Sequence, residues 1–148
     1  MSHASIIPLI GGETIAMQNV FGEEPKYILS YTDFEANDSQ LVNYYNNRVP
    51  YIKLDKGGSA PSRVDVVNTV CPCAGLSSLS FTSGSDNPAN DWMLRAARYV
   101  LEYVKPEVFW GENAPRLASK MGQPIVKEMR KMAKEFGYSV RHHQPKSI

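Results

Sequence analysis

The chain has 148 residues, of which 43% are hydrophobic and 21% are charged, and this composition excludes a wholly disordered protein. No apolar run is long enough for a transmembrane helix, and the amino terminus lacks the features of a signal peptide, so no membrane partner is expected. Two cysteines exclude a disulfide framework and do not by themselves form a zinc site. We therefore expect no metal and a reducing, cytoplasmic compartment.

The net charge of +1 is unevenly distributed. Residues 1–115 hold 8 basic and 13 acidic side chains, which gives −5, whereas residues 116–148 hold 8 basic and 2 acidic ones, which gives +6. A basic carboxyl-terminal region is suited to a polyanion, but basic residues at helical spacing fit a solvated helix face equally well.

Short apolar segments alternate with helical ones along the chain. The segment Val64–Val70, which is apolar almost throughout, predicts a central strand that is buried on both faces. Asp38 or Ser39 is a candidate cap for the second helix. The alternation predicts an α/β fold with a parallel, doubly wound sheet. The predicted strands are Ile6–Ile10, Tyr27–Tyr31, Val49–Leu54, 64–70, 108–110 and 138–141, and the predicted helices are 13–20, 38–46, 91–104 and 116–136, the last with a break near Gly122–Pro124.

Polar and reactive residues follow several of these strands, at the carboxyl ends where such sheets bind ligands. Gly11–Gly12 after the first strand allows a close approach to a ligand, although a tight turn explains the pair as well. After the second strand, Asp33 and Glu35 both qualify to bind ribose hydroxyls, and either could instead cap the next helix. Asp55 can accept a hydrogen bond from an adenine amino group, or it can simply belong to the turn that follows it.

The segment after the central strand carries the sharpest chemical signal. Cys71, close to the strand, fits a small buried hydrophobe, whereas Cys73 lies in a loop where a thiolate is accessible. Glu112 follows the strand 108–110, and its alternative is a surface carboxylate. Trp110 and Ala114–Pro115 beside it predict an enclosed position, in which burial raises the pKa of a carboxyl group and favours its protonated form.

Taken in order, these motifs resemble DNA (cytosine-5)-methyltransferases, and they are most similar to the cofactor-binding and catalytic part of Dcm-like enzymes of phages. Two motifs carry the resemblance, Pro72-Cys73-Ala74-Gly75-Leu76-Ser77 and Trp110-Gly111-Glu112-Asn113-Ala114-Pro115. The resemblance extends from about Ile6 to Tyr138. It implies the Rossmann-like fold of methyltransferases that depend on S-adenosylmethionine.

The resemblance also implies a role for each site residue. Cys73 attacks C6 of a cytosine flipped out of double-stranded DNA, which makes C5 nucleophilic toward a methyl group. Glu112 hydrogen-bonds the ring nitrogen N3 and the amino group of that base, and Asn113 positions the Cys73 loop. The glycine pair lies near the methionine part of the cofactor, Asp33 or Glu35 binds its ribose, and Asp55 binds its adenine. The implied cofactor-binding residues are Gly11, Gly12, Asp33, Glu35, Asp55 and Pro72.

The chain departs from the family pattern at several positions. No aromatic residue precedes the glycine pair, Ala74 follows the nucleophile where Gln is usual, and Ala114 stands where Val is usual. The family's later Gln-x-Arg-x-Arg motif and target-recognition domain do not occur before Ile148. We therefore expect one truncated catalytic domain spanning residues 1–148, with a sheet that is incomplete at its carboxyl-terminal end.

Three functions fit these observations. The first is a cytosine-5 methyltransferase of a phage or restriction–modification system that works with a second polypeptide supplying the remaining motifs. The second is an inactive relic that keeps the fold as a cofactor- or DNA-binding module. The third is a different Cys/Glu enzyme that acts on a pyrimidine nucleotide.

Overall fold

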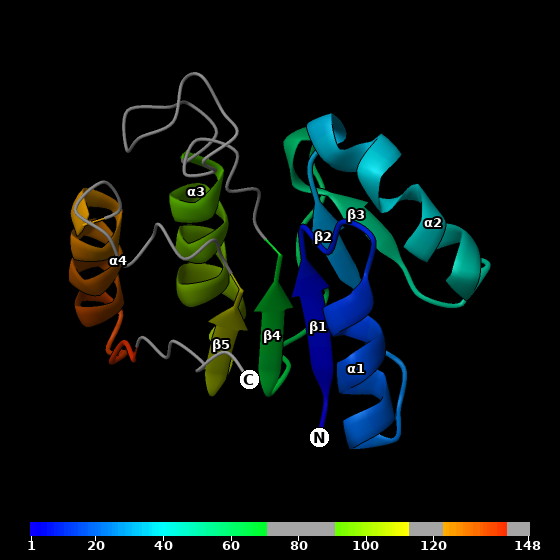
Figure 1. Cartoon of the computed structure of the whole chain (residues 1–148), viewed down its shortest axis with the longest axis horizontal. Helices are drawn as coiled ribbons and strands as arrows, with labels where there is room; N and C mark the ends of the chain where they lie inside the picture. Colours follow the sequence, from blue (N-terminus) through cyan, green and yellow to red (C-terminus); the bar gives the residue numbers. More distant parts are fainter. Residues whose placement is uncertain (71–90, 113–122, 142–148) are drawn as a thin grey trace, which may run out of the picture. The chain divides into compact units, whose positions relative to one another are not determined.

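The computed structural model of the chain describes residues 1–70, 91–112 and 123–141 (Figure 1). These residues fall into two compact units, residues 1–70 with 99–112 and residues 91–98 with 123–141. Within the described residues, no helix has both the length and the apolar character needed to cross a membrane.

The described part of the first unit is built on a parallel sheet of five strands in the order β3-β2-β1-β4-β5. This arrangement confirms the predicted α/β fold with a Rossmann-like parallel sheet. Strand β4, which lies inside the sheet between β1 and β5, is buried along its whole length, as predicted for the segment 64–70. The strands are β1 (His3–Ile6), β2 (Ile28–Ser30), β3 (Tyr51–Lys53), β4 (Val66–Thr69) and β5 (Val108–Gly111).

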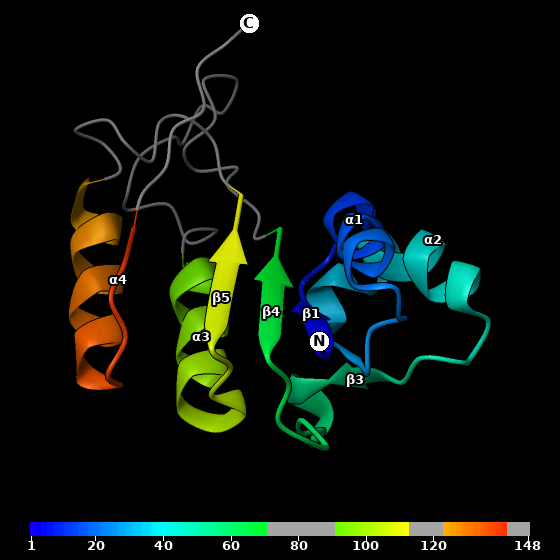
Figure 2. The ribbon, with the colours of Figure 1, turned by 90° about the horizontal axis from the view of Figure 1, so that it is seen from below.

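Two helices of this unit, α1 (Gly12–Phe21) and α2 (Glu35–Tyr45), lie on the same side of strands β1 to β3 (Figure 2). A short 3₁₀ turn follows β2 at Thr32–Phe34, and another follows β3 at Leu54–Lys56. A π-helical segment, Val100–Val104, precedes β5. The helices pack on the sheet through a buried apolar cluster, with partly buried Ile15 and Tyr51 against it. Its buried members are Ile28, Leu41, Tyr45 and Val49.

The described part of the second unit contains helix α4 (Gln123–Glu135) and most of α3 (Asp91–Tyr99). Arg98 of α3 contacts the end of α4. Its guanidinium lies 3.6 Å from the Glu135 carboxylate and 5.5 Å from the centre of the Phe136 ring. A polyanion-binding region and a solvated helix face both require accessible basic side chains, and the basic side chains of α4 are exposed. The buried residues of these helices are Met93, Ala96, Ala97, Ile125, Met132 and Ala133, and the exposed basic ones are Lys127, Arg130, Lys131 and Lys134.

The structure corrects two of the predicted strands. The first strand spans His3–Ile6 rather than Ile6–Ile10. It does not continue because Pro8 has no N–H for the ladder and the chain turns there into a loop. The predicted strand 138–141 does not form among its described residues. The amide of Tyr138 instead donates to the carbonyl of Ala133 at 2.7 Å, so this backbone belongs to the end of α4.

Candidate functional site

The predicted site residues that the structure describes lie after strands that end at one edge of the sheet. Because the strands are parallel, their carboxyl ends meet at that edge (Figure 1). The loop after β1 carries Gly11 and Gly12, Asp33 follows β2, Asp55 follows β3, and Glu112 follows β5. The remaining predicted residues, Pro72, Cys73 and Asn113, lie outside the described residues.

The two glycines of the loop after β1 have different surroundings. Gly11 has φ +92°, and a Cβ there would lie 2.5 Å from Cδ1 of Leu41 on α2. This position therefore requires glycine for the turn and for the close packing of α2. A Cβ on Gly12, at the start of α1, would meet no heavy atom within 4 Å. The tight-turn explanation thus accounts for Gly11, while Gly12 leaves open space beside the helix.

The same loop is held by Asp38, which the sequence had suggested as a helix cap. That suggestion is wrong, because α2 begins three residues earlier and Asp38 is fully buried within it. Its carboxylate accepts hydrogen bonds from the amide of Leu9 (2.9 Å) and from the hydroxyls of Ser30 (2.6 Å) and Tyr51 (2.7 Å). Burial raises the pKa of Asp38, although these three hydrogen bonds oppose the rise.

The two acidic candidates after β2 differ in their contacts. Glu35 forms an ion pair with Lys53 at 3.1 Å. Asp33 is exposed, and no described residue pairs with its carboxylate. Both oxygens of Asp55 accept from the amide of Thr32, at 3.0 and 3.2 Å. Asp55 therefore anchors the turn that carries Asp33. Desolvation acts to raise the pKa of Asp55, but the hydrogen bonds from Thr32 outweigh it and lower that pKa.

Glu112 is exposed, so the predicted enclosed position is wrong among the described residues. The strand before it also has an open side, since Val108 and Trp110 are 49% and 39% exposed. The indole N–H of Trp110 donates to the sulfur of Met17 on α1 at 3.2 Å. The Trp110 ring therefore contacts α1. The residues next to Glu112 in the sequence did not predict how exposed its side chain is.

Sequence reasoning missed two polar residues near this edge. The Nδ2 group of Asn68, on β4, donates to Oε1 of Glu13 in the first turn of α1 at 3.2 Å. Burial raises the pKa of Glu13 to about 7, the hydrogen bond from Asn68 opposes this rise, and the Glu112 carboxyl adds to it. The available signal was Asn68 itself, a strongly hydrogen-bonding side chain within a strand predicted to be buried on both faces.

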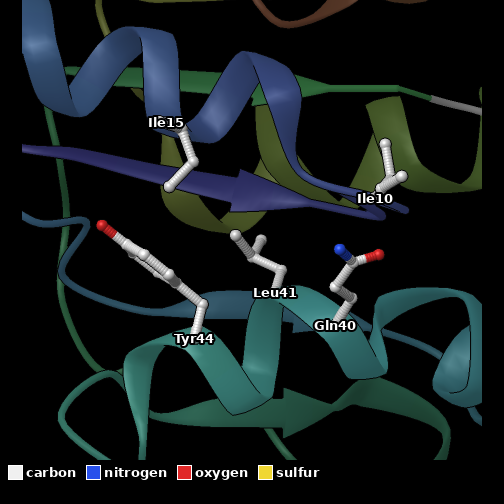
Figure 3. A pocket seen from close by; sticks show the side chains of 5 residues that line it. All are labelled: Ile10, Ile15, Gln40, Leu41 and Tyr44. Carbon is white, nitrogen blue, oxygen red and sulfur yellow. The ribbon is translucent and has the colours of Figure 1, made fainter.

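A hollow of about 210 Å³ lies between α1 and α2 (Figure 3). None of the predicted site residues lines it, so it is separate from the candidate site. Among the described residues, no group of three or more His, Cys, Asp or Glu side chains could hold a metal ion. The lining residues of the hollow are Ile10, Ile15, Gln40, Leu41 and Tyr44.

The chain matches the model of a known protein family. The model of the family described as C-5 cytosine-specific DNA methylase matches residues 3–146. That span includes the whole parallel sheet and every predicted site residue. No curated protein matches the chain.

Proposed function

Because the chain belongs to the C-5 cytosine-specific DNA methylase family, whose members are DNA methyltransferases acting at cytosine C5, we propose how its own residues carry out that reaction. In this proposal S-adenosylmethionine is the methyl donor, and Cys73 forms a covalent adduct with a cytosine flipped out of double-stranded DNA. The observation that carries the proposal is the placement of Gly12, Asp33, Asp55 and Glu112 after strands that end at one edge of the sheet.

The chemistry of the described side chains fits the cofactor. The carboxylate of Asp33, which no described residue pairs with, can accept hydrogen bonds from ribose hydroxyls, whereas that of Glu35 already faces Lys53. Asp55 can accept from the adenine amino group with the lone pairs that Thr32 does not use. The open space at Gly12 admits the methionine part near the start of α1, and Pro72 completes the proposed set.

The bound cofactor supplies an electrophilic methyl group. The Cys73 thiolate adds to C6 of the cytosine, which makes C5 nucleophilic. Glu112 hydrogen-bonds N3 and the amino group and so stabilises charge that develops on the ring. Asn113 holds the loop that carries the nucleophile. After C5 has gained the methyl group it loses its proton, the bond from Cys73 to C6 breaks, and the thiolate is released.

We also propose that residues 1–148 act as one catalytic domain together with a second polypeptide. We propose that the reaction takes place in the cytoplasm, in a phage or a restriction–modification system.

Cofactor binding is tested by titration calorimetry with S-adenosylmethionine on the full chain. We expect Asp33→Ala and Asp55→Ala to weaken binding about 10–100-fold, as the loss of hydrogen bonds to a charged group does. Glu35→Ala, at the start of α2 and two residues after Asp33, is the matched control, and its affinity should stay within about 2-fold of the wild type. Equal binding by the wild type and Asp33→Ala would remove Asp33 from the site.

The nucleophile is tested by trapping on duplex DNA that contains 5-fluorocytosine, in the presence of the cofactor. Fluorine at C5 prevents the release step, so the adduct accumulates. We expect a covalent complex that Cys73→Ser abolishes and Cys71→Ser retains. A chain that binds the cofactor but gives no adduct would instead be a binding module. Loss of the adduct in Cys71→Ser alone would show that the nucleophile was misassigned.

A further inference from the structure

The charge of the chain divides between its two units. The described residues of the first unit hold 6 basic and 11 acidic side chains, which gives −5. Those of the second unit hold 7 basic and 3 acidic ones, which gives +4. The uneven charge along the sequence is therefore a property of one compact unit, and a polyanion is attracted to that unit rather than to the other.

Helix α4 of the second unit carries its apolar and basic side chains on opposite faces. Ile125, Met132 and Ala133 are buried, whereas the basic side chains are exposed. Because successive residues of a helix are turned by about 100°, the basic positions fall within one arc of about 100°, opposite the buried positions. We call this arc the basic face of α4, and it consists of Lys127, Arg130, Lys131 and Lys134.

The lysines of the basic face are not neutralised by acidic side chains of the described residues. No described carboxylate lies within ion-pairing distance of Lys127, Lys131 or Lys134. The carboxylate of Glu135, on the same helix, instead pairs with Arg98 of α3 at 3.6 Å. A helix face that is merely solvated usually alternates charges of opposite sign, which form ion pairs along it. A segregated basic arc without such pairs favours an anionic partner.

The burial of the apolar face decides between two kinds of anionic partner. A helix that binds a membrane surface inserts its apolar side chains among the lipids, but those of α4 are already buried within the protein. The family of this chain acts on DNA, which is itself a polyanion. Duplex DNA carries one negative charge per about 1.7 Å of its length. The lysines span about 10 Å along α4, so several phosphates can lie within their reach at once.

We propose that the basic face of α4 binds the phosphate backbone of duplex DNA, independently of the base sequence. Its lysine ammonium groups donate charge-assisted hydrogen bonds to phosphate oxygens and release counterions from the DNA. Such contacts give affinity and orient a protein on the duplex, whereas contacts to the bases give specificity. The inference rests on the proposed function for the choice of DNA as the partner. It adds a contact on the second unit, whereas the described residues of the candidate site belong to the first.

The surface is tested by fluorescence anisotropy of the full chain with a labelled duplex, at salt concentrations from about 50 to 200 mM. In the double variant Lys127→Gln/Lys131→Gln, we expect the slope of log affinity against log salt to become shallower by about 2, one for each lost phosphate contact. Affinity at the lowest salt should fall about 10-fold or more, equally on two duplexes of unrelated sequence. Both positions are exposed and Gln has nearly the helix propensity of Lys, so the fold should tolerate these changes.

The matched control is the double variant Lys26→Gln/Lys105→Gln, which removes the same charge at exposed positions that precede β2 and β5. Its salt slope should equal that of the wild type. Equal losses in the two double variants would show that net charge alone matters, and would overturn the proposal. An unchanged slope in the α4 variant, or no binding of the duplex by the wild type, would also overturn it. Weaker binding of the α4 variant only to vesicles of phosphatidylserine and phosphatidylcholine would assign the face to a membrane instead.

The 5-fluorocytosine trap separates a failure of this inference from a failure of the proposed function. An adduct in the wild type, together with an unchanged salt slope in the α4 variant, would remove the surface and leave the proposed function standing. A shallower slope in the α4 variant, together with no adduct in the wild type, would retain the surface and overturn the proposed chemistry.

Discussion

The backbone amide of Leu9 donates a hydrogen bond of 2.9 Å to Oδ1 of Asp38. Leu9 has φ 53° and Ile7, two residues earlier, has φ 49°. Left-handed backbone at such side chains costs about 1–3 kcal/mol per residue, and for a β-branched residue such as Ile7 it is an outlier. The buried carboxylate also accepts from Ser30 and Tyr51. Asp38 thus joins this strained loop to strands β2 and β3, and it determines where the glycine pair lies.

Replacing Asp38 should therefore destabilise the fold. In Asp38→Ala the amide and both hydroxyls lose their acceptor, and we expect the free energy of unfolding to fall by about 1–3 kcal/mol in urea denaturation. Asp38→Asn keeps an acceptor for Leu9 and should lose less. Asn43→Ala, at an exposed position of the same helix, is the control. An Asp38→Ala protein as stable as Asn43→Ala would mean that these hydrogen bonds contribute nothing net.

Adjacent glycines should respond oppositely to alanine. Gly11→Ala adds a Cβ 2.5 Å from Leu41 at φ +92°, so we expect the free energy of unfolding to fall by about 1–3 kcal/mol. Gly12→Ala adds a Cβ in open space, and stability should stay the same or rise by up to about 1 kcal/mol. Thermal unfolding of the two variants side by side checks this. Equal losses in both would refute the assigned difference in packing.

Position 111 requires glycine because Thr69 of the neighbouring strand β4 lies close to its backbone. A Cβ at Gly111 would lie 2.8 Å from Cγ2 of Thr69 and 3.0 Å from its carbonyl oxygen. Because the backbone oxygen cannot move away cheaply, Gly111→Ala should lower the free energy of unfolding by about 1–3 kcal/mol. It should also reduce the yield of 5-fluorocytosine adduct, since Glu112 is the next residue. Adding Thr69→Ala removes only the side-chain clash and should recover part of the stability. Full recovery would indicate that the backbone approach is not limiting.

Stability should depend on pH through Glu13. Its pKa is raised from 4.5 to about 7 in the fold, so the folded state holds the proton more tightly than the unfolded chain does. This contribution is complete below pH 4.5 and is lost as the pH rises through about 7. We therefore expect the free energy of unfolding to decrease across this range in the wild type and to change less in Glu13→Gln. Urea denaturation at pH values on both sides of the range measures the difference. Parallel pH dependences in the two proteins would contradict the assignment.

The parts of the fold that the sequence predicted are those determined by local pattern. The apolar run around β4 and the alternation of strands and helices predicted a parallel sheet, and that sheet brings Asp33, Asp55 and Glu112 to one edge. The strand expected at 138–141 did not form, because its local pattern competes with the end of α4 for the same backbone groups.

The features of the fold that the sequence did not predict depend on contacts between residues that are distant in the chain. The sequence suggested Asp38 as a helix cap, because its actual donors lie in the loop before α1 and in strands β2 and β3. Glu13 meets Asn68 only because α1 folds back over β4, 55 residues away in the sequence. The exposure of Glu112 likewise depends on what the rest of the chain places over β5, which its immediate neighbours do not determine.

One chain of hydrogen bonds links α1, β1 and β4: the hydroxyls of Thr14 and Ser5 lie 2.8 Å apart, Ser5 donates to Oδ1 of Asn68, and Asn68 donates to Glu13. This chain constrains how the sequence can diverge. An apolar replacement at Asn68 would remove the acceptor of the buried Ser5 hydroxyl and the donor to the Glu13 carboxyl. Single substitutions are therefore costly, whereas joint replacement of all four by apolar residues is not. Relatives should carry these four polar residues together or lack them together, and the set should be inherited as one unit.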